Sequence, residues 1–202
     1  MSGFDRAEYA ARTARAQALM ARAGLSALLL TTEPEVRYFT GFLTRFWESP
    51  ARPWFLVVPA SGEPVAVIPS IGADLMGRCW ISQVRTWDAP HPEDDGVSLL
   101  IDTLCGLVPQ QARIGVPMGL ETQLRMPLAD YDRVATGIAP RRFVDGTAAI
   151  QRVREVKSAA EIARIRTACD IAGRAFARVP EFVGSGRPLD AVFRAFQATL
   201  LQ

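Results

Sequence analysis

The segment that most restricts the possible fold is a short apolar run at residues 25–31, LSALLLT. Such a run is typical of a strand with two buried faces, because a solvent-exposed face would place polar residues at every second position. Residues 4–23 are rich in alanine, leucine and arginine and predict a helix that ends at Gly24. Residues 34–40 predict a second, short helix. A strand between such helices belongs inside a sheet that helices cover.

The following residues continue the alternation of strands and helices. Two β-rich runs, residues 54–58 and 64–68, are joined by PASGE, which predicts a hairpin. We expect further elements, in chain order: a helix at 71–78, a strand at 83–87, an exposed loop at 88–96, a helix at 97–108, a strand at 113–116, a weak helix at 121–134 broken near Pro127, and a strand at 142–144. The pattern predicts an α/β fold with a mixed sheet flanked by helices.

The character of the sequence changes near residue 147. Ser158 and Glu161 form the pattern of a capping box, and apolar residues recur behind it at helical spacing. Another amphipathic helix begins near Pro188. We therefore expect one domain over residues 1–147 and a second segment over residues 148–202.

Composition excludes several classes of function. The formal charge is +2 and no basic run occurs, so neither nucleic acid nor an anionic membrane is an expected partner. No apolar stretch approaches the ~20 residues of a membrane-spanning helix. The three cysteines form no CxxC pair and indicate reduced thiols in a cytoplasmic protein. The single histidine, His91, lies in an acidic loop, where a solvated surface is the expected role and a weak ion site the alternative.

Three segments together resemble the family of creatinase, prolidase and aminopeptidase P. They are LLLTTEPEVRYFTGF at residues 28–42, WFLVVPASGEPVAVIPS at 54–70, and AAIQRVREVKSAAEIARIRTACDIAGRAF at 148–176. The last is similar to the family's linker, an arginine-containing helix followed by Lys-Ser/Thr-x-x-Glu and the first helix of the catalytic domain. The order and spacing of the segments carry the resemblance, which spans nearly the whole chain.

The resemblance implies a fold and a chemistry. Residues 1–147 would form the family's amino-terminal domain, a ribonuclease H-like mixed sheet, and residues 148–202 the linker and two helices of a truncated "pita-bread" catalytic domain. In the family, two aspartates, one histidine and two glutamates hold two divalent metal ions (Mn, Co or Zn) that activate water. This sequence contains no counterpart of those ligands, so we expect no catalytic residue, metal ligand or cofactor in this chain.

The loop at residues 43–54, LTRFWESPARPW, contains the candidate binding residues. In family members the amino-terminal domain packs against a partner subunit, and its loops overhang the partner's active site. Arg45 and Arg52 are candidates for binding a substrate carboxylate across a homodimer, since a planar guanidinium donates two parallel hydrogen bonds. Phe46 and Trp47 are candidates for a wall against an apolar or cationic group. Packing into the core, with the arginines solvated, is the alternative.

Three functions compete for the whole protein. The first is a metal-dependent hydrolase of Xaa-Pro peptides or small amides, in which this part serves dimerisation and substrate gating and is inactive alone. The second is a peptide-binding or scaffold module of a pseudoenzyme. The third is a non-peptidase enzyme on the same scaffold, such as a lyase or an ectoine-type hydrolase.

Overall fold

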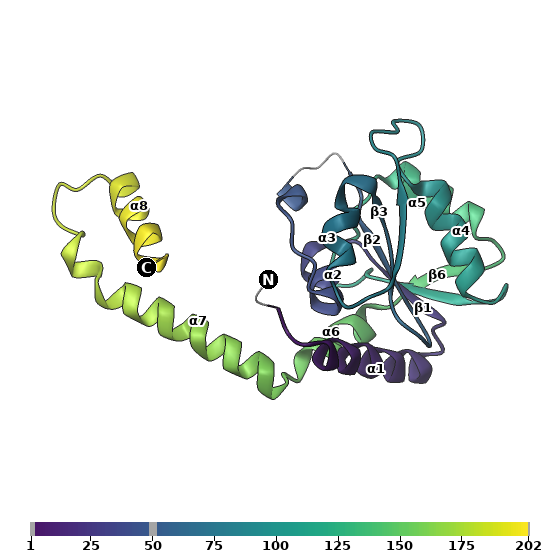
Figure 1. The fold of residues 1–202 in the computed structure, drawn as a ribbon, viewed down its shortest axis with the longest axis horizontal. Helices are drawn as coiled ribbons and strands as arrows, with labels where there is room; N and C mark the ends of the chain where they lie inside the picture. The colour runs from purple at the N-terminus through teal and green to yellow at the C-terminus, as the bar shows by residue number, and fades with distance from the viewer. Residues whose placement is uncertain (1–2, 49–51, 202) are drawn as a thin grey trace. The chain divides into compact units, whose positions relative to one another are not determined.

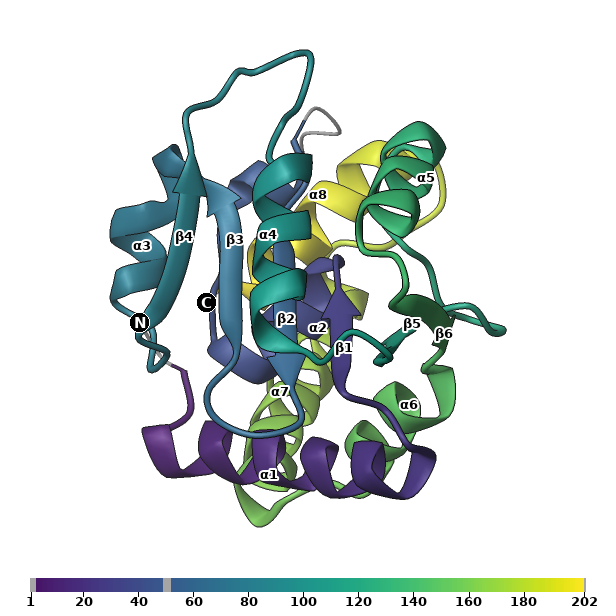
Figure 2. The same cartoon turned by 90° about the vertical axis from the view of Figure 1, so that its right-hand side faces the viewer.

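The computed structural model describes residues 3–48 and 52–201 and divides the chain into two compact units, Met1–Val156 and Lys157–Gln202. Figure 1 and Figure 2 together label their helices and strands. In the first unit the elements are α1 (Arg6–Ala23), β1 (Ala27–Leu30), α2 (Glu33–Thr40), the 3-10 helix η1 (Arg45–Glu48), β2 (Phe55–Pro59), β3 (Val65–Pro69), η2 (Ser70–Gly72), α3 (Ala73–Gly77), β4 (Gln83–Trp87), α4 (Val97–Leu107), β5 (Arg113–Val116), α5 (Leu128–Gly137), β6 (Arg142–Asp145) and α6 (Thr147–Glu155).

The strands form one mixed sheet in the order β4-β3-β2-β1-β5-β6. β2 is antiparallel to both β1 and β3, whereas β3–β4, β1–β5 and β5–β6 are parallel pairs. The β2–β3 hairpin and the mixed α/β sheet confirm the sequence prediction. The apolar run lies in β1, at the centre of the sheet, with Leu30 opposite Leu56 of β2.

Helices cover both faces of this sheet, which explains why every side chain of β1 is apolar. Leu28 and Leu30 point to a core closed by α1, α2, α3 and α6. Ala27 and Leu29 point to a second core closed by α4 and α5. In Figure 2, α4 lies in front of the strands. Alternate residues of one strand thus belong to opposite cores, as the pleat of a strand requires.

Local signals set the limits of the first two helices. The Asp5 carboxylate accepts a hydrogen bond from the Glu8 N–H at 2.8 Å, which caps the start of α1. α1 ends at Gly24 (φ 63°) and α2 ends at Gly41 (φ 78°), both in the left-handed conformation that favours glycine. The predicted ends of both helices are confirmed.

The prediction of a helix over residues 121–134 is wrong in its first half. The helix α5 begins at Leu128, directly after Pro127, and the stretch before it is irregular. Proline lacks an N–H and is disfavoured inside a helix, but it fits a helix start. The preceding stretch is held elsewhere, since the Arg125 N–H donates to the Thr31 hydroxyl at 2.7 Å. Tertiary contacts therefore override a weak helical pattern.

The helix α6 belongs to the first unit and is joined to α1 and α2 through Tyr38. The Tyr38 hydroxyl donates to the Val153 carbonyl at 2.9 Å. The buried Arg12 donates to the Tyr38 carbonyl, also at 2.9 Å, and its guanidinium lies 4.4 Å from the Tyr38 ring centroid. One tyrosine of α2 therefore connects the first and last helices of this unit.

The second unit is a helical pair. It contains α7 (Ala159–Ala177), η3 (Val179–Glu181) and α8 (Leu189–Leu200). The predicted capping box is present, because the Ser158 hydroxyl accepts from the Glu161 N–H and the Ser158 N–H donates to the Glu161 carboxylate. The rings of Phe176 and Phe196 join the two helices at 4.9 Å between centroids. No helix among the described residues is long and apolar enough to cross a membrane.

Candidate functional site

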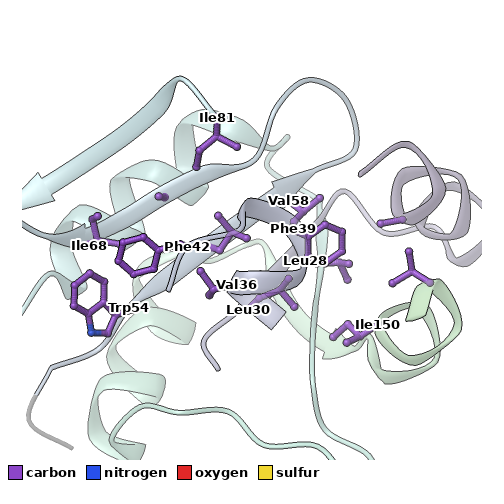
Figure 3. Close-up of a cluster of buried hydrophobic side chains, with 14 of the residues drawn as sticks. Leu28, Leu30, Val36, Phe39, Phe42, Trp54, Val58, Ile68, Ile81 and Ile150 are labelled. Atoms are coloured by element: carbon purple, nitrogen blue, oxygen red, sulfur yellow. The ribbon is translucent and has the colours of Figure 1, made fainter. Parts of the chain in front are cut away.

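The 43–54 loop connects α2 to β2 and begins with the short helix η1. Its base is an aromatic cluster of Phe42, Phe46, Trp47 and Trp54. Phe42 and Trp54 are fully buried, with ring centroids 5.3 Å apart, and lie beside each other in the core (Figure 3). Trp47 packs on Trp54 at 5.7 Å and is only 8% exposed. The aromatic residues of the loop therefore hold it to the sheet.

The candidate binding residues of this loop differ in exposure. Phe46 is 42% exposed, although one face of its ring stacks on Trp54 at 6.4 Å. Arg45 is exposed and Arg52 is half-buried. Trp47 is buried, so the loop offers Phe46 rather than Trp47 as an accessible ring. Residues 49–51 of this loop lie outside the described residues.

A residue that the sequence does not single out, Arg125, contacts this loop. Its Nη1 donates to the Arg52 carbonyl at 3.1 Å, and its guanidinium carbon lies 5.6 Å from the Trp47 ring centroid. Burial lowers the pKa of Arg125 from its ordinary value, and the group remains a cation at neutral pH. Arg125 belongs to no motif and lies in an irregular stretch, so the sequence alone gives no indication of this contact.

A pocket of about 350 Å³ lies where the loop meets the start of α5. Its lining includes two arginines, two aspartates and four apolar residues. The lining residues are Arg52, Pro53, Asp95, Leu124, Arg125, Met126, Pro127 and Asp130. The structure thus brings Arg52 next to Arg125, whereas Arg45 does not line this pocket.

A second pocket, of about 450 Å³, lies at the end of β1 and the start of α2. Glu35 lines it and is 5% exposed. Burial raises the pKa of Glu35 above its ordinary value of 4.5, although hydrogen bonds from Thr32 lower it. The Thr32 hydroxyl donates to the Glu35 carboxylate at 2.7 Å. This carboxylate is part of the cap of α2 and is retained at the cost of burying a charge.

Replacing Glu35 by glutamine is expected to change the pH dependence of stability. With a folded-state pKa above 4.5, the folded protein holds the proton more tightly than the unfolded chain. The free energy of unfolding therefore falls as pH rises from about 4.5 through the raised pKa. Glutamine keeps a capping acceptor without a charge, so Glu35→Gln should gain stability relative to wild type across this window. Urea unfolding between pH 4 and 8 measures the difference.

Glu63 provides a comparison in which the pKa is shifted in the opposite direction. Hydrogen bonds from the Ser82 N–H and hydroxyl lower the pKa of Glu63 below 4.5. Its ionised form therefore stabilises the fold above pH 4.5, and this stabilisation is lost as pH falls through the lowered pKa. Glu63→Gln should lose stability relative to wild type as pH rises from the lowered pKa to about 4.5, so the urea series for this variant extends below pH 4. If the stability difference from wild type changes with pH in the same direction for both variants, the raised pKa assigned to Glu35 is wrong.

The described residues do not fit a metal centre. Nowhere in residues 3–48 and 52–201 do three His, Cys, Asp or Glu side chains gather in a way that could hold a metal ion. The His91 loop is closed by backbone hydrogen bonds from Asp94 and Asp95 to the His91 carbonyl.

Comparison with known proteins places this geometry in a family. The sequence profile of the Creatinase/Prolidase N-terminal domain matches residues 12–156. A probable dipeptidase PepE of Mycobacterium bovis is 31% identical over 184 residues, which cover 91% of this chain and 46% of that protein. An agropine synthesis cyclase of Rhizobium rhizogenes is 28% identical over 89% of this chain and 45% of its own length. The chain spans about half the length of the curated relatives it matches.

Solved structures give the same result. The dipeptidase PepE of Mycobacterium ulcerans superimposes with a TM-score of 0.74 at 29% identity, covering 99% of this chain and 51% of that protein. A recombinant prolidase of Thermococcus sibiricus superimposes with a TM-score of 0.80 at 17% identity, covering 98% and 50%. The similarity to the prolidase, at 17% identity, shows a shared fold only. Given the profile match over most of its length, the chain belongs to the Creatinase/Prolidase N-terminal domain family.

Proposed function

We propose that this chain is the non-catalytic amino-terminal domain of a metal-dependent Xaa-Pro dipeptidase or creatinase-like hydrolase. Its work there is to form a homodimer and to gate substrate entry. The family assignment and the dipeptidase names of its relatives support the hydrolase class. Two divalent metal ions would supply the water nucleophile from the part of the enzyme outside this domain.

The observation that carries the gating role is the construction of the 43–54 loop. Buried Trp47 and Trp54 hold the loop in place, while Arg45 and Phe46 remain exposed and Arg52 lines a pocket. The residues that this packing holds in place lose less conformational entropy when they bind a ligand. Its guanidinium groups suit a peptide carboxylate, and the exposed Phe46 ring suits an apolar side chain.

The test is hydrolysis of a Gly-Pro dipeptide by the whole Mn²⁺-loaded enzyme. Arg45→Ala or Arg52→Ala is expected to lower kcat/KM by roughly ten- to a hundredfold, the effect of one lost charge-assisted hydrogen bond. Arg22→Ala, which removes an exposed arginine from the last turn of α1, is the matched control and should change nothing. Residues 1–202 alone should show no turnover.

Two results would contradict the proposal. Unchanged kinetics in both loop variants, with an intact dimer, would show that the loop does not take part in substrate recognition. Metal-dependent hydrolysis by residues 1–202 alone would place the chemistry in this chain.

The relative from Rhizobium favours a second candidate, a non-peptidase enzyme on the same scaffold. Its name, agropine synthesis cyclase, describes a reaction other than peptide hydrolysis. The similarity covers 89% of this chain and 45% of the relative. The same domain would then gate a small amide or a related metabolite. Absence of Gly-Pro hydrolysis by the whole metal-loaded enzyme would favour this candidate over the dipeptidase.

A further inference from the structure

Arg125 joins three points of the first unit that are distant in sequence. Its backbone N–H donates to the Thr31 hydroxyl at the end of β1, at 2.7 Å. Its Nη1 donates to the Arg52 carbonyl at 3.1 Å, across 73 positions of sequence. Its guanidinium also lies over the Trp47 ring, 5.6 Å from the centroid. One residue therefore contacts the central strand and both halves of the 43–54 loop.

These contacts use properties that arginine alone combines. The guanidinium is planar, so it can lie over an aromatic ring and donate a hydrogen bond in its own plane at the same time. An ammonium group has no such plane, and a neutral side chain lacks the charge. Because Arg125 is half-buried, solvent weakens both interactions less than at an exposed site.

The loop needs such support because regular structure covers little of it. Between α2 and β2 the described backbone contains the four-residue η1 and no strand. Within the part of the loop that the structure describes, Phe46 and Trp47 also pack on Trp54. Those contacts are between aromatic rings, whereas the bond from Arg125 holds the loop backbone at the Arg52 carbonyl.

We infer that Arg125 is a positioning residue for substrate recognition, which holds the 43–54 loop against the end of β1 so that Arg45, Phe46 and Arg52 face their ligand. This inference rests on the function proposed for the loop. Arg125 acts through the loop and is not assigned a contact with the reacting atoms.

Limited proteolysis of the chain itself tests the positioning. Trypsin cleaves after Arg45, whereas Pro53 protects the bond after Arg52, so cleavage at Arg45 reports local opening of the loop. Arg125→Met is expected to raise the cleavage rate at this bond about tenfold, as one charge-assisted hydrogen bond and one cation–π contact are lost. Mass spectrometry of the fragments resolves this bond from other tryptic sites.

Arg141→Met is the matched control. Arg141 also donates to backbone carbonyls, those of Val108 and Cys105 at 3.0 and 2.9 Å, but it holds a different connection. Cleavage at Arg45 no faster in Arg125→Met than in Arg141→Met would overturn the inference. If Arg125→Met fails to fold, Arg125→Lys takes its place, with about threefold faster cleavage expected and a wild-type rate as the contradicting result.

Kinetics of the whole enzyme separate this inference from the proposed function. Arg125→Met should raise KM for Gly-Pro about tenfold with little change in kcat, because a loosened loop weakens binding without touching the metal. A fall in kcat at constant KM would overturn the positioning role. Faster cleavage at Arg45 with unchanged KM and kcat would show that Arg125 holds the loop while the loop does not gate substrate, which contradicts the proposed function.

Discussion

Trp54→Ala is expected to lower the free energy of unfolding by about 3–5 kcal/mol, the usual cost of truncating a large buried aromatic side chain. Trp54 is 1% exposed, and it contacts the rings of Phe42, Phe46 and Trp47. Gly72 lies so close that a Cβ there would collide with the Trp54 ring. The cavity left by alanine is therefore lined by rigid rings and backbone, which cannot collapse to fill it.

Chemical denaturation followed by circular dichroism measures this loss. Leu120→Ala is the control, because Leu120 is a large apolar residue that is 89% exposed, and its change should stay within about 0.5 kcal/mol. Trp54→Phe should lie between the two, since it keeps a ring and removes an indole N–H that has no acceptor among the described residues. A loss below about 1 kcal/mol in Trp54→Ala would mean that the aromatic cluster does not carry the core.

The same substitution should couple to Arg125. Both residues hold the 43–54 loop, Trp54 by packing under Trp47 and Arg125 by its hydrogen bond to the Arg52 carbonyl. Residues that share a partner show non-additive effects. In the double variant, tryptic cleavage at Arg45 should therefore accelerate by less than the product of the two single effects, because either change alone already frees much of the loop.

The strands and helix ends of this fold could be predicted from local sequence. The bounds of β4 and β5 agree with the predicted runs at residues 83–87 and 113–116. The first helix ends at Gly24 and the second at Thr40, as predicted, because each left-handed cap depends on a single glycine. The pairing of β1 with β5 could not be predicted from local sequence. It joins residues 27 and 114 and depends on the packing of the whole domain.

The candidate site was predictable in part, for the same physical reason. The loop stands out because Arg45, Phe46 and Arg52 are concentrated in a few residues of sequence. Tryptophan is a common residue type in binding sites, yet the structure buries Trp47 against Trp54. Arg125 gave no signal because its role arises only when a stretch between β5 and α5 reaches the end of β1. The same contact explains why α5 begins later than predicted, since it holds the residues before Leu128 in an irregular conformation.

Gly146→Ala is the second substitution with a large expected effect, at about 3 kcal/mol or more of lost stability. Gly146 follows β6, and its N–H donates to the Val116 carbonyl of β5 at 2.9 Å. A Cβ at Gly146 would lie 2.8 Å from Gly115 Cα and 3.1 Å from the Val116 nitrogen. These are backbone atoms, which cannot turn aside as a side chain can, so β5 and β6 must separate and weaken that hydrogen bond.

Gly106→Ala separates this steric cost from the general effect of replacing glycine. Gly106 lies in α4 with nothing within 4 Å of the position that a Cβ would take, so alanine there should raise stability by about 0.5–1 kcal/mol. The same methyl group is thus expected to stabilise one site and to destabilise the other. Equal effects of the two substitutions on the denaturation midpoint would show that β5 and β6 are not in close contact at Gly115 and Gly146.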